Sequence, residues 1–250
     1  MAIPLHQAQV YDAPVVHLEA AGRTDVGKVR RRNEDRICIG SWRSGHNNDL
    51  RESRHQLGDQ PLLLAVADGM GGYSGGEMAA ETVLNRLQTT RWTSLDENQV
   101  RDTLRTAASD LKGLANRVNA LTLMGSTIAG VLMDGTELLA FNVGDSRVYR
   151  WRAGWLQQLS TDDRDPTSGM LTHVLTASAG LTRVHMERHS LREGDRLFLC
   201  SDGLTGRVMD EELAHGLLDG AEGAEALFNL ALSRGATDNV SVVYAEVHLA

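Results

Sequence analysis

Acidic residues recur along this chain where a short apolar run meets a turn. The apolar runs predict buried strands, so the acidic residues would stand at strand ends. Carboxylates at several strand ends can converge on one edge of a sheet, where they repel one another unless a cation neutralises them. The five sites are Glu34 with Asp35 in RRNED, Asp68 in AVADGMGG, Asp145 in NVGDSR, Asp202 in LCSDGL and Asp238 in ATDNVSVV.

The chemistry of this set favours a hard metal ion. Ligands that are all oxygen atoms suit Mg2+, Mn2+ or Ca2+ rather than zinc, and none of the nine histidines falls in an HExxH or similar pair. Each aspartate taken singly has a simpler interpretation as a turn or cap residue, because Asp-Gly is among the commonest turn dipeptides. The prediction of a metal site therefore depends on the set.

The elements that would position these residues change in type along the chain. We expect strands at 14–20, 36–41 and 62–67, then a helix that begins with a Ser74-x-x-Glu77 capping box and runs to about Thr90. A second helix begins near Asp96. From Gly125 onward the pattern predicts antiparallel strands, followed by helices at 210–218 and 222–234 and a last strand, NVSVVYAEV. The charged stretch at about 42–60 has no hydrophobic period and predicts a polar surface loop.

The second helix carries an apolar stripe with alternating steps of four and three residues. Such a stripe forms either a coiled-coil seam or the buried face of a helix that packs within its own domain, and the second interpretation is the default. The stripe consists of Val100, Leu104, Ala107, Leu111, Leu114, Val118 and Leu121.

From RRNED onward the sequence resembles the metal-dependent protein phosphatases of the PPM, or type 2C, family, in its bacterial serine/threonine branch. Five blocks match in the family's order and together span about residues 22 to 245. The resemblance implies one PPM-type domain over 1–250, of class α+β: a four-layer αββα sandwich with two antiparallel sheets flanked by helices. The blocks are GRTDVGKVRRRNED (22–35), VADGMGG (66–72), GSTIAG with NVGDSRVYR (125–150), DRLFLCSDGL (195–204) and ATDNVSVV (236–243).

The resemblance also implies a reaction and a metal site. The chain would hydrolyse phosphoserine and phosphothreonine in proteins by attack of a water that bridges two Mn2+ or Mg2+ ions. Asp68 would bridge both ions and the carbonyl of Gly69 would bind one of them. The remaining ligands would be Asp202 and Asp238, with Glu34 or Asp35 bound directly or through water.

Two more positions follow from the same resemblance. In some bacterial members a third, weaker ion is held by the aspartates that match Asp145 and Asp202. Arg30, four residues before Glu34, matches the arginine that grips the substrate phosphate, for which a planar guanidinium fork is well suited. From the local sequence alone, Arg30 reads equally well as part of a solvated basic run.

The sequence departs from the family in two places. Met70 stands where many eukaryotic members have a histidine proposed as general acid, so we assign no general acid. The flap at about 160–180 is shorter than in many bacterial members and lacks their Thr-x-Asp-His-Ser pattern. Because the flap lies beside the active site in the family, substrate specificity is the property that transfers least.

Other phosphate chemistries fit the residues less well. A cysteine phosphatase needs five residues between its thiol and its arginine, whereas six separate Cys200 from Arg207. The glycines of DGMGGYSGG match neither GxxxxGK[ST] nor GxGxxG, which disfavours nucleotide binding. A metal-dependent nuclease and a catalytically silent, phosphoprotein-binding relative stay as alternatives, although a silent relative would be expected to have lost one of its metal-binding aspartates.

The overall composition of the chain limits the classes of partner that we expect it to bind. A net charge of −8 argues against a nucleic-acid binder, which needs a basic face, and no apolar run approaches the length of a membrane span. Two cysteines in apolar surroundings suggest free thiols in a reducing compartment, so we expect a cytoplasmic protein. We also expect a monomer, because packing within the domain explains the stripe of the second helix more simply than a dimer seam does. The expected partners are phosphorylated proteins and a cognate Ser/Thr kinase. Type VI secretion includes compact phosphatases of this family, but no residue here selects that context.

Overall fold

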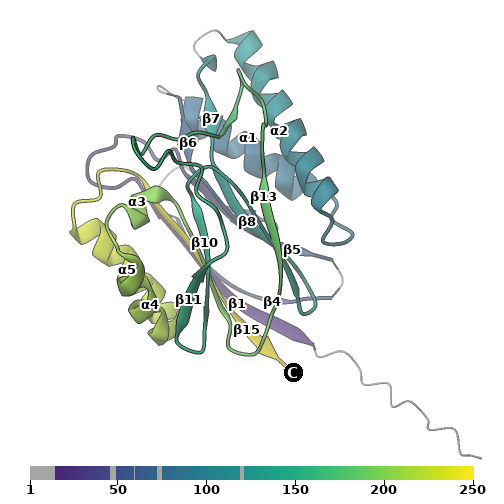
Figure 1. The fold of residues 1–250 in the computed structure, drawn as a ribbon, viewed down its shortest axis with the longest axis vertical. Helices are drawn as coiled ribbons and strands as arrows, with labels where there is room; N and C mark the ends of the chain where they lie inside the picture. The colour runs from purple at the N-terminus through teal and green to yellow at the C-terminus, as the bar shows by residue number, and fades with distance from the viewer. Residues whose placement is uncertain (1–14, 46–48, 59, 72–74, 119–120) are drawn as a thin grey trace, which may run out of the picture.

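Two six-stranded antiparallel sheets form the centre of the computed structural model, which describes residues 15–45, 49–58, 60–71, 75–118 and 121–250 (Figure 1). In spatial order, the first sheet consists of β11 (Trp155–Gln158), β10 (Arg147–Arg152), β14 (Arg196–Cys200), β15 (Val240–Leu249), β1 (Val16–Asp25) and β4 (Leu50–Gln56). The second consists of β13 (His185–Ser190), β9 (Glu137–Val143), β8 (Ile128–Asp134), β5 (Leu62–Ala67), β2 (Arg36–Ile39) and β3 (Trp42–Arg43). A small sheet joins β12 (Leu175–Thr176), β7 (Gly125–Ser126) and β6 (Gly69–Met70).

The apolar run of β5 shows why these segments form central strands. Successive side chains of a strand point to opposite faces, so a strand that is buried on both faces reads as a continuous apolar run. Leu63 and Ala65 of β5 pack against helices, whereas Leu64 and Val66 pack between the two sheets. The same alternation occurs in β14 and β15.

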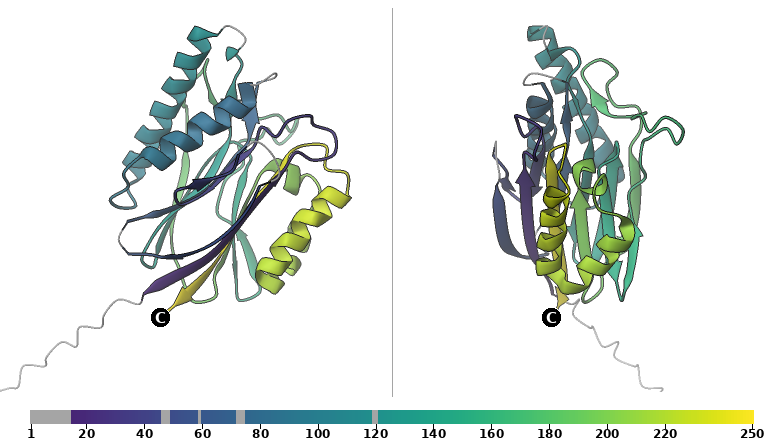
Figure 2. Two further views of the ribbon diagram at one scale, coloured as in Figure 1. Left: turned by 180° about the vertical axis from the view of Figure 1, so that it is seen from behind. Right: turned by 90° about the vertical axis from the view of Figure 1, so that its left-hand side faces the viewer.

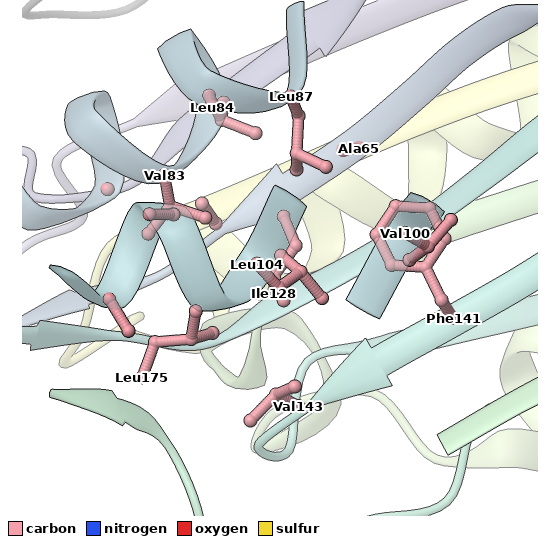
Figure 3. Packing of buried hydrophobic residues seen from close by; sticks show 14 of the residues in the cluster. Ala65, Val83, Leu84, Leu87, Val100, Leu104, Ile128, Phe141, Val143 and Leu175 are labelled. Atoms are coloured by element: carbon pink, nitrogen blue, oxygen red, sulfur yellow. The ribbon is translucent and has the colours of Figure 1, made fainter. Parts of the chain in front are cut away.

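Helices α1 (Gly75–Thr89) and α2 (Glu97–Arg117) cover the outer face of the second sheet. Leu84 and Leu104 are fully buried there, against residues of β8 and β9 (Figure 3). The side chain of Asp96 caps α2 by accepting a hydrogen bond from the amide of Asn98 at 2.8 Å. Val100, Leu104, Ala107 and Leu111 of the apolar stripe therefore lie in the core of their own chain, as the simpler interpretation predicted. The stripe does not continue along the helix to its predicted end, because α2 ends at Arg117 and Val118 is exposed.

The outer face of the first sheet is covered by the C-terminal helices α3 (Asp202–Thr205), α4 (Asp210–Gly216) and α5 (Gly220–Ser233), with a 3-10 turn at Leu217–Asp219. The two groups of helices lie on opposite sides of the strands (Figure 2). The expected αββα arrangement of class α+β is confirmed.

The segment at 42–60 differs from the predicted surface loop. It contains β3 and β4, and β4 pairs with β1 along the free edge of the first sheet, from His17 opposite Gln56 to Arg23 opposite Leu50. Most side chains of β4 are exposed, so the strand depends on backbone pairing rather than on a buried face. A strand with two polar faces carries no hydrophobic period, which is why the sequence pattern missed it.

The expected capping box at the start of α1 includes Ser74, which lies outside the described residues. Its other member, Glu77, accepts a hydrogen bond from Arg36 at 2.7 Å. Among the described residues, no helix is long and apolar enough to cross a membrane.

Candidate active site

The loop between β1 and β2, the loop before β15, β6 and α3 lie at the same end of the two sheets (Figure 1). The predicted acidic residues lie in these segments, directly before β6, or in the loop between β9 and β10. This end of the sandwich is therefore the candidate active site.

Glu34 is positioned by a side chain from the other end of the sequence. Its amide donates to Oδ1 of Asn239 at 2.8 Å, and Nδ2 of Asn239 donates to the carbonyls of Val26 and Arg32, each at 2.9 Å. One carboxamide thus ties three points of the loop at 26–34 to the start of β15. Asn239 is buried, so this arrangement is part of the core rather than a surface contact.

Asp35 points into the interior, where Oδ2 accepts a hydrogen bond from the hydroxyl of Ser201 at 2.7 Å. Below it, the buried guanidinium of Arg36 donates to the carbonyls of Asn33 and Asp35, at 3.0 and 2.7 Å. Its Nη2 also pairs with Glu77 of α1 at 2.7 Å. The acidic loop is therefore fastened to α1 through an arginine that has almost no contact with solvent.

Asp68 connects β5 to the small sheet. Its carbonyl accepts hydrogen bonds from the amide of Thr127 at 2.8 Å and from the hydroxyl of Ser126 at 3.1 Å. The next residue, Gly69, has no room for a side chain, because a Cβ there would lie 2.0 Å from the carbonyl oxygen of Gly76 and 2.7 Å from that of Glu34. This close approach brings the backbone of Gly69 and the Glu34 segment together.

Asp202 and Asp238 each pair with an arginine. Asp202 is the first residue of α3, and its Oδ2 accepts a hydrogen bond from Arg164 at 2.7 Å. Asp238 precedes β15, and its Oδ2 accepts from Nη2 of Arg30 at 2.7 Å. Both arginine side chains are half-exposed, with 39% and 51% of their area accessible.

Asp145 lies in the turn between β9 and β10, with only 3% of the residue exposed. Oδ2 of Asp145 is in contact with Nη2 of Arg164, the same nitrogen that binds Asp202. Arg164 comes from the short flap, so the flap reaches the acidic residues directly.

The electrostatics of the site reflect crowded, buried carboxyls. The pKa of Asp68 lies well above its usual range, because the group is buried and because four other aspartates repel its charge. Those four are Asp35, Asp202, Asp238 and Asp145. Burial also raises the pKa of Asp35 to about 7, although hydrogen bonds from Ser241 and Ser201 oppose the shift.

The remaining members follow the same trend. Burial raises the pKa of Glu34, against the opposing charge of Arg30, and it raises the pKa of Asp145 and of Asp202 despite their contact with Arg164. Groups that resist ionisation in this way favour a bound cation, because the cation stabilises their charged form.

These residues have the chemistry of a site for hard divalent ions, but their side chains are not gathered around one. As the side chains stand, no three His, Cys, Asp or Glu residues among the described parts of the chain are arranged to hold a metal ion. The ion pairs of Asp202 with Arg164 and of Asp238 with Arg30 hold two of the expected ligands toward arginines. The donor set fits Mn2+ or Mg2+ in type, and each of these two carboxylates has a second oxygen besides the Oδ2 atom that its arginine contacts.

Sequence reasoning overlooked several residues that build the site. Asn239 was quoted within ATDNVSVV without a role, and Ser201 within LCSDGL, although both neighbour predicted ligands. Arg164 had no signal at all, because the TDDRD run reads as a solvated turn. By contrast Cys200 is fully buried and free, and burial raises the pKa of its thiol, as expected for an inert cysteine.

Comparison with known proteins agrees with the fold. Residues 43–237 match the family model for protein phosphatase 2C. The chain is 31% identical to the serine/threonine protein phosphatase PstP of Mycobacterium tuberculosis, over 92% of this chain and 45% of PstP. It therefore spans about half the length of that relative. It is 28% identical to the serine/threonine phosphatase stp of Listeria monocytogenes, over 92% of this chain and 96% of stp.

Solved structures give the same result. The catalytic domain of PstP, in complex with two manganese ions, superposes with a TM-score of 0.77 at 31% identity, covering 93% of this chain and 99% of the domain. PppA, a regulatory component of type VI secretion in Pseudomonas aeruginosa, superposes with a TM-score of 0.75 at 25% identity, covering 94% of this chain and all of PppA.

Fold, site and family match together define a metal-dependent protein phosphatase domain. The chain belongs to the protein phosphatase 2C, or PPM, family. Within that family its relatives are serine/threonine phosphatases of bacteria, so it falls in the bacterial branch.

Proposed function

We propose that this chain is a phosphoprotein phosphatase that hydrolyses phosphoserine and phosphothreonine with two Mn2+ or Mg2+ ions. The observation that carries the proposal is the buried carboxyl of Asp68, whose pKa is raised by burial and by the charges of Asp202 and Asp238 from two distant segments of the sequence. A buried carboxylate beside other carboxylates forms a site that divalent cations can stabilise. The two manganese ions of the PstP catalytic domain support the same number.

Each predicted site residue keeps its role within this proposal. Asp68 would hold the ions together with the carbonyl of Gly69. Asp202 and Asp238 would complete the set, together with Glu34 or Asp35. Ions bound there would supply an activated water and offset the charge of the phosphate.

Arg30 binds the substrate phosphate. Its guanidinium stands half-exposed beside Asp238, and only Nη2 is used in that pair. A guanidinium presents five N–H donors in a planar fork, so the others can bind phosphate oxygens while Asp238 fixes the orientation of the group. The hydrogen bond from Arg30 to Asp238 raises the pKa of the guanidinium further, so it stays charged throughout the working range.

The proposal extends to the cellular setting. A phosphatase of this kind opposes a Ser/Thr kinase, and the two free, buried cysteines agree with a reducing compartment such as the cytoplasm. We expect a monomer, since the apolar stripe of α2 is used within the chain. Met70 has no proton to donate, so a water or another group would protonate the leaving oxygen, and we assign no general acid.

The test is hydrolysis of a phosphothreonine peptide by metal-stripped protein, with Mn2+, Mg2+, Ca2+ or no metal added back. Wild type should release phosphate with Mn2+ or Mg2+, and Asp68→Asn should fall to background. Asp110→Asn serves as the matched control, because Asp110 pairs with Arg86 on the surface of α2 and should leave turnover unchanged.

Two outcomes would point elsewhere. A folded, metal-loaded protein that binds the phosphopeptide without releasing phosphate would be the catalytically silent relative. Faster cleavage of DNA than of the peptide, measured side by side, would favour the nuclease.

A further inference from the structure

Arg164 makes an unusual contact for a residue of a surface flap. Its Nη2 lies between two carboxylates from different elements, touching Oδ2 of Asp145 and donating to Oδ2 of Asp202 at 2.7 Å. Its Nη1 donates to the carbonyl of Gly169 at 3.0 Å, which closes the tip of the flap over the same side chain. One guanidinium thus neutralises two acidic residues and orders the flap.

The neighbours of Arg164 fix it in this position. Asp163 and Gly144 bond reciprocally: the Asp163 amide donates to the Gly144 carbonyl at 2.9 Å, and the Gly144 amide donates to Asp163 Oδ2 at 3.0 Å. Gly144 directly precedes Asp145, so these bonds fix the flap within one residue of the contact. Two residues before Arg164, Oδ2 of Asp162 accepts hydrogen bonds from Nε and Nη2 of Arg147, at 2.9 and 2.7 Å.

Asp163 is itself firmly held. Its Oδ1 accepts from Arg183 at 2.7 Å and from His185 at 2.9 Å, and His173 lies 3.4 Å away. Burial opposes the charge of Asp163, but the hydrogen bonds from Gly144, Arg183 and His185 outweigh burial and lower its pKa. Arg164 is therefore presented to the site by a rigid part of the flap.

Asp145 needs such a partner. It is 3% exposed, and its Oδ2 accepts no well-directed hydrogen bond from the described residues, so the contact with Arg164 is mainly electrostatic. A buried carboxylate without a compensating cation is costly, and a divalent ion or a guanidinium can each provide the charge. Here the chain supplies the guanidinium itself.

We propose that Arg164 is a built-in cation that occupies the space between Asp145 and Asp202, so that this phosphatase binds two divalent ions rather than three. The proposal rests on the proposed function, because the two ions are those at Asp68, Asp202 and Asp238. Removing Arg164 should open a third, weaker site at Asp145. The flap would then lose its tie to the metal centre.

The experiment counts Mn2+ bound per chain on metal-stripped protein, by equilibrium dialysis with elemental analysis and by calorimetric titration. Wild type should bind two ions, and Arg164→Ala should bind three, the last more weakly. Arg188→Ala is the matched control, since Arg188 of β13 pairs with Glu97 of α2 rather than with an aspartate of the site or of the flap, and this variant should bind two. Arg164→Lys keeps the charge and should also bind two.

A second variant protects against loss of folding. Arg164→Ala leaves Asp145 as an unpaired buried charge, so the double variant Arg164→Ala/Asp145→Asn should regain thermal stability and return to two ions. Two ions in Arg164→Ala, or three in wild type, would overturn the role of Arg164 while leaving the phosphatase proposal intact. Fewer than two ions in folded wild type would overturn both.

Discussion

Removing the carboxylate of Glu77 should destabilise the protein far more than removing that of Glu81, one turn later on the same helix. Glu77 pairs at 2.7 Å with Arg36, whose side chain is 1% exposed, and Glu77 itself is 19% exposed. Glu81 pairs with Arg43 at 3.4 Å, with side-chain exposures of 44% and 25%. The two glutamates therefore provide a matched comparison of a buried and an open ion pair.

The expected magnitudes differ several-fold. Removing one partner of a buried pair costs about 3–5 kcal/mol, because the other charge is left uncompensated. Arg36 would keep the carbonyls of Asn33 and Asp35 as acceptors, so we expect the lower end, about 3 kcal/mol. An exposed pair contributes about 0.2–1 kcal/mol. At about 2–4 °C per kcal/mol for a chain of this size, Glu77→Ala should lower the Tm by roughly 6–12 °C and Glu81→Ala by no more than about 4 °C.

Thermal and urea unfolding of metal-free protein measure this difference. Glu77→Gln keeps an acceptor for Arg36 and should lose an intermediate amount. Because Arg36 lies directly below the loop that carries Glu34 and Asp35, Mn2+ affinity should also fall in Glu77→Ala but not in Glu81→Ala. Equal losses of stability in the two alanine variants would refute the view that the Arg36–Glu77 pair anchors the acidic loop.

Three further predictions concern the core, the flap and the thiols. Leu104→Ala should lower the free energy of unfolding in urea by about 2–5 kcal/mol, because Leu104 is buried. Val118→Ala, at the exposed end of the same stripe, should leave the free energy of unfolding nearly unchanged. Similar losses in the two variants would contradict the burial of Leu104 in the core. Because the pKa of Asp163 is lowered on folding, its stabilisation is present above the usual carboxylate pKa of about 3.9 and disappears as the pH falls through the folded value. Thermal unfolding should therefore show a larger loss for Asp163→Asn at about pH 6 than at about pH 3, and a constant loss would count against this linkage. Burial raises the pKa of Cys38 to about 12 and that of Cys200 further, so neither thiol should react with a disulfide reagent at about pH 8 until urea unfolds the chain; rapid reaction of native protein would contradict the burial.

The sequence predicted a helix or strand correctly wherever its buried side chains follow a regular pattern along the chain. The run 62–67 reads as a continuous apolar strand because both of its faces are covered, and the stripe of α2 reads as a buried face because Val100 and Leu104 meet the core. The edge strand β4 left no such trace, since its side chains are mostly exposed and its order comes from the backbone of β1. A pattern of side chains in the sequence cannot predict a strand that is stabilised mainly by backbone hydrogen bonds to its neighbour.

The residues of the candidate site also fall into two groups, those that the sequence pattern predicted and those that it did not. Asp68, Asp202 and Asp238 could be predicted as site residues because each follows or precedes an apolar strand in a motif of its own. Their supports were harder to find, because Asn239 and Arg164 act across 205 and 38 residues of sequence, respectively. Such contacts depend on which loops meet in space, and one sequence without its fold does not contain that information.

The arginines of the site explain how so many acidic residues can share one end of the sandwich. Asp68 resists ionisation because it is buried and because its neighbours are also acidic, yet Asp202 and Asp238 each have a guanidinium within hydrogen-bonding distance. Arg30 and Arg164 therefore lower the repulsion at this end of the sandwich, because each places a positive charge against one of these carboxylates. Each of these hydrogen bonds uses only Oδ2 of its aspartate, so a second carboxylate oxygen is left for a cation. We therefore expect that substitution of either arginine changes the affinity of these carboxylates for a divalent ion, because it removes a positive charge from beside them.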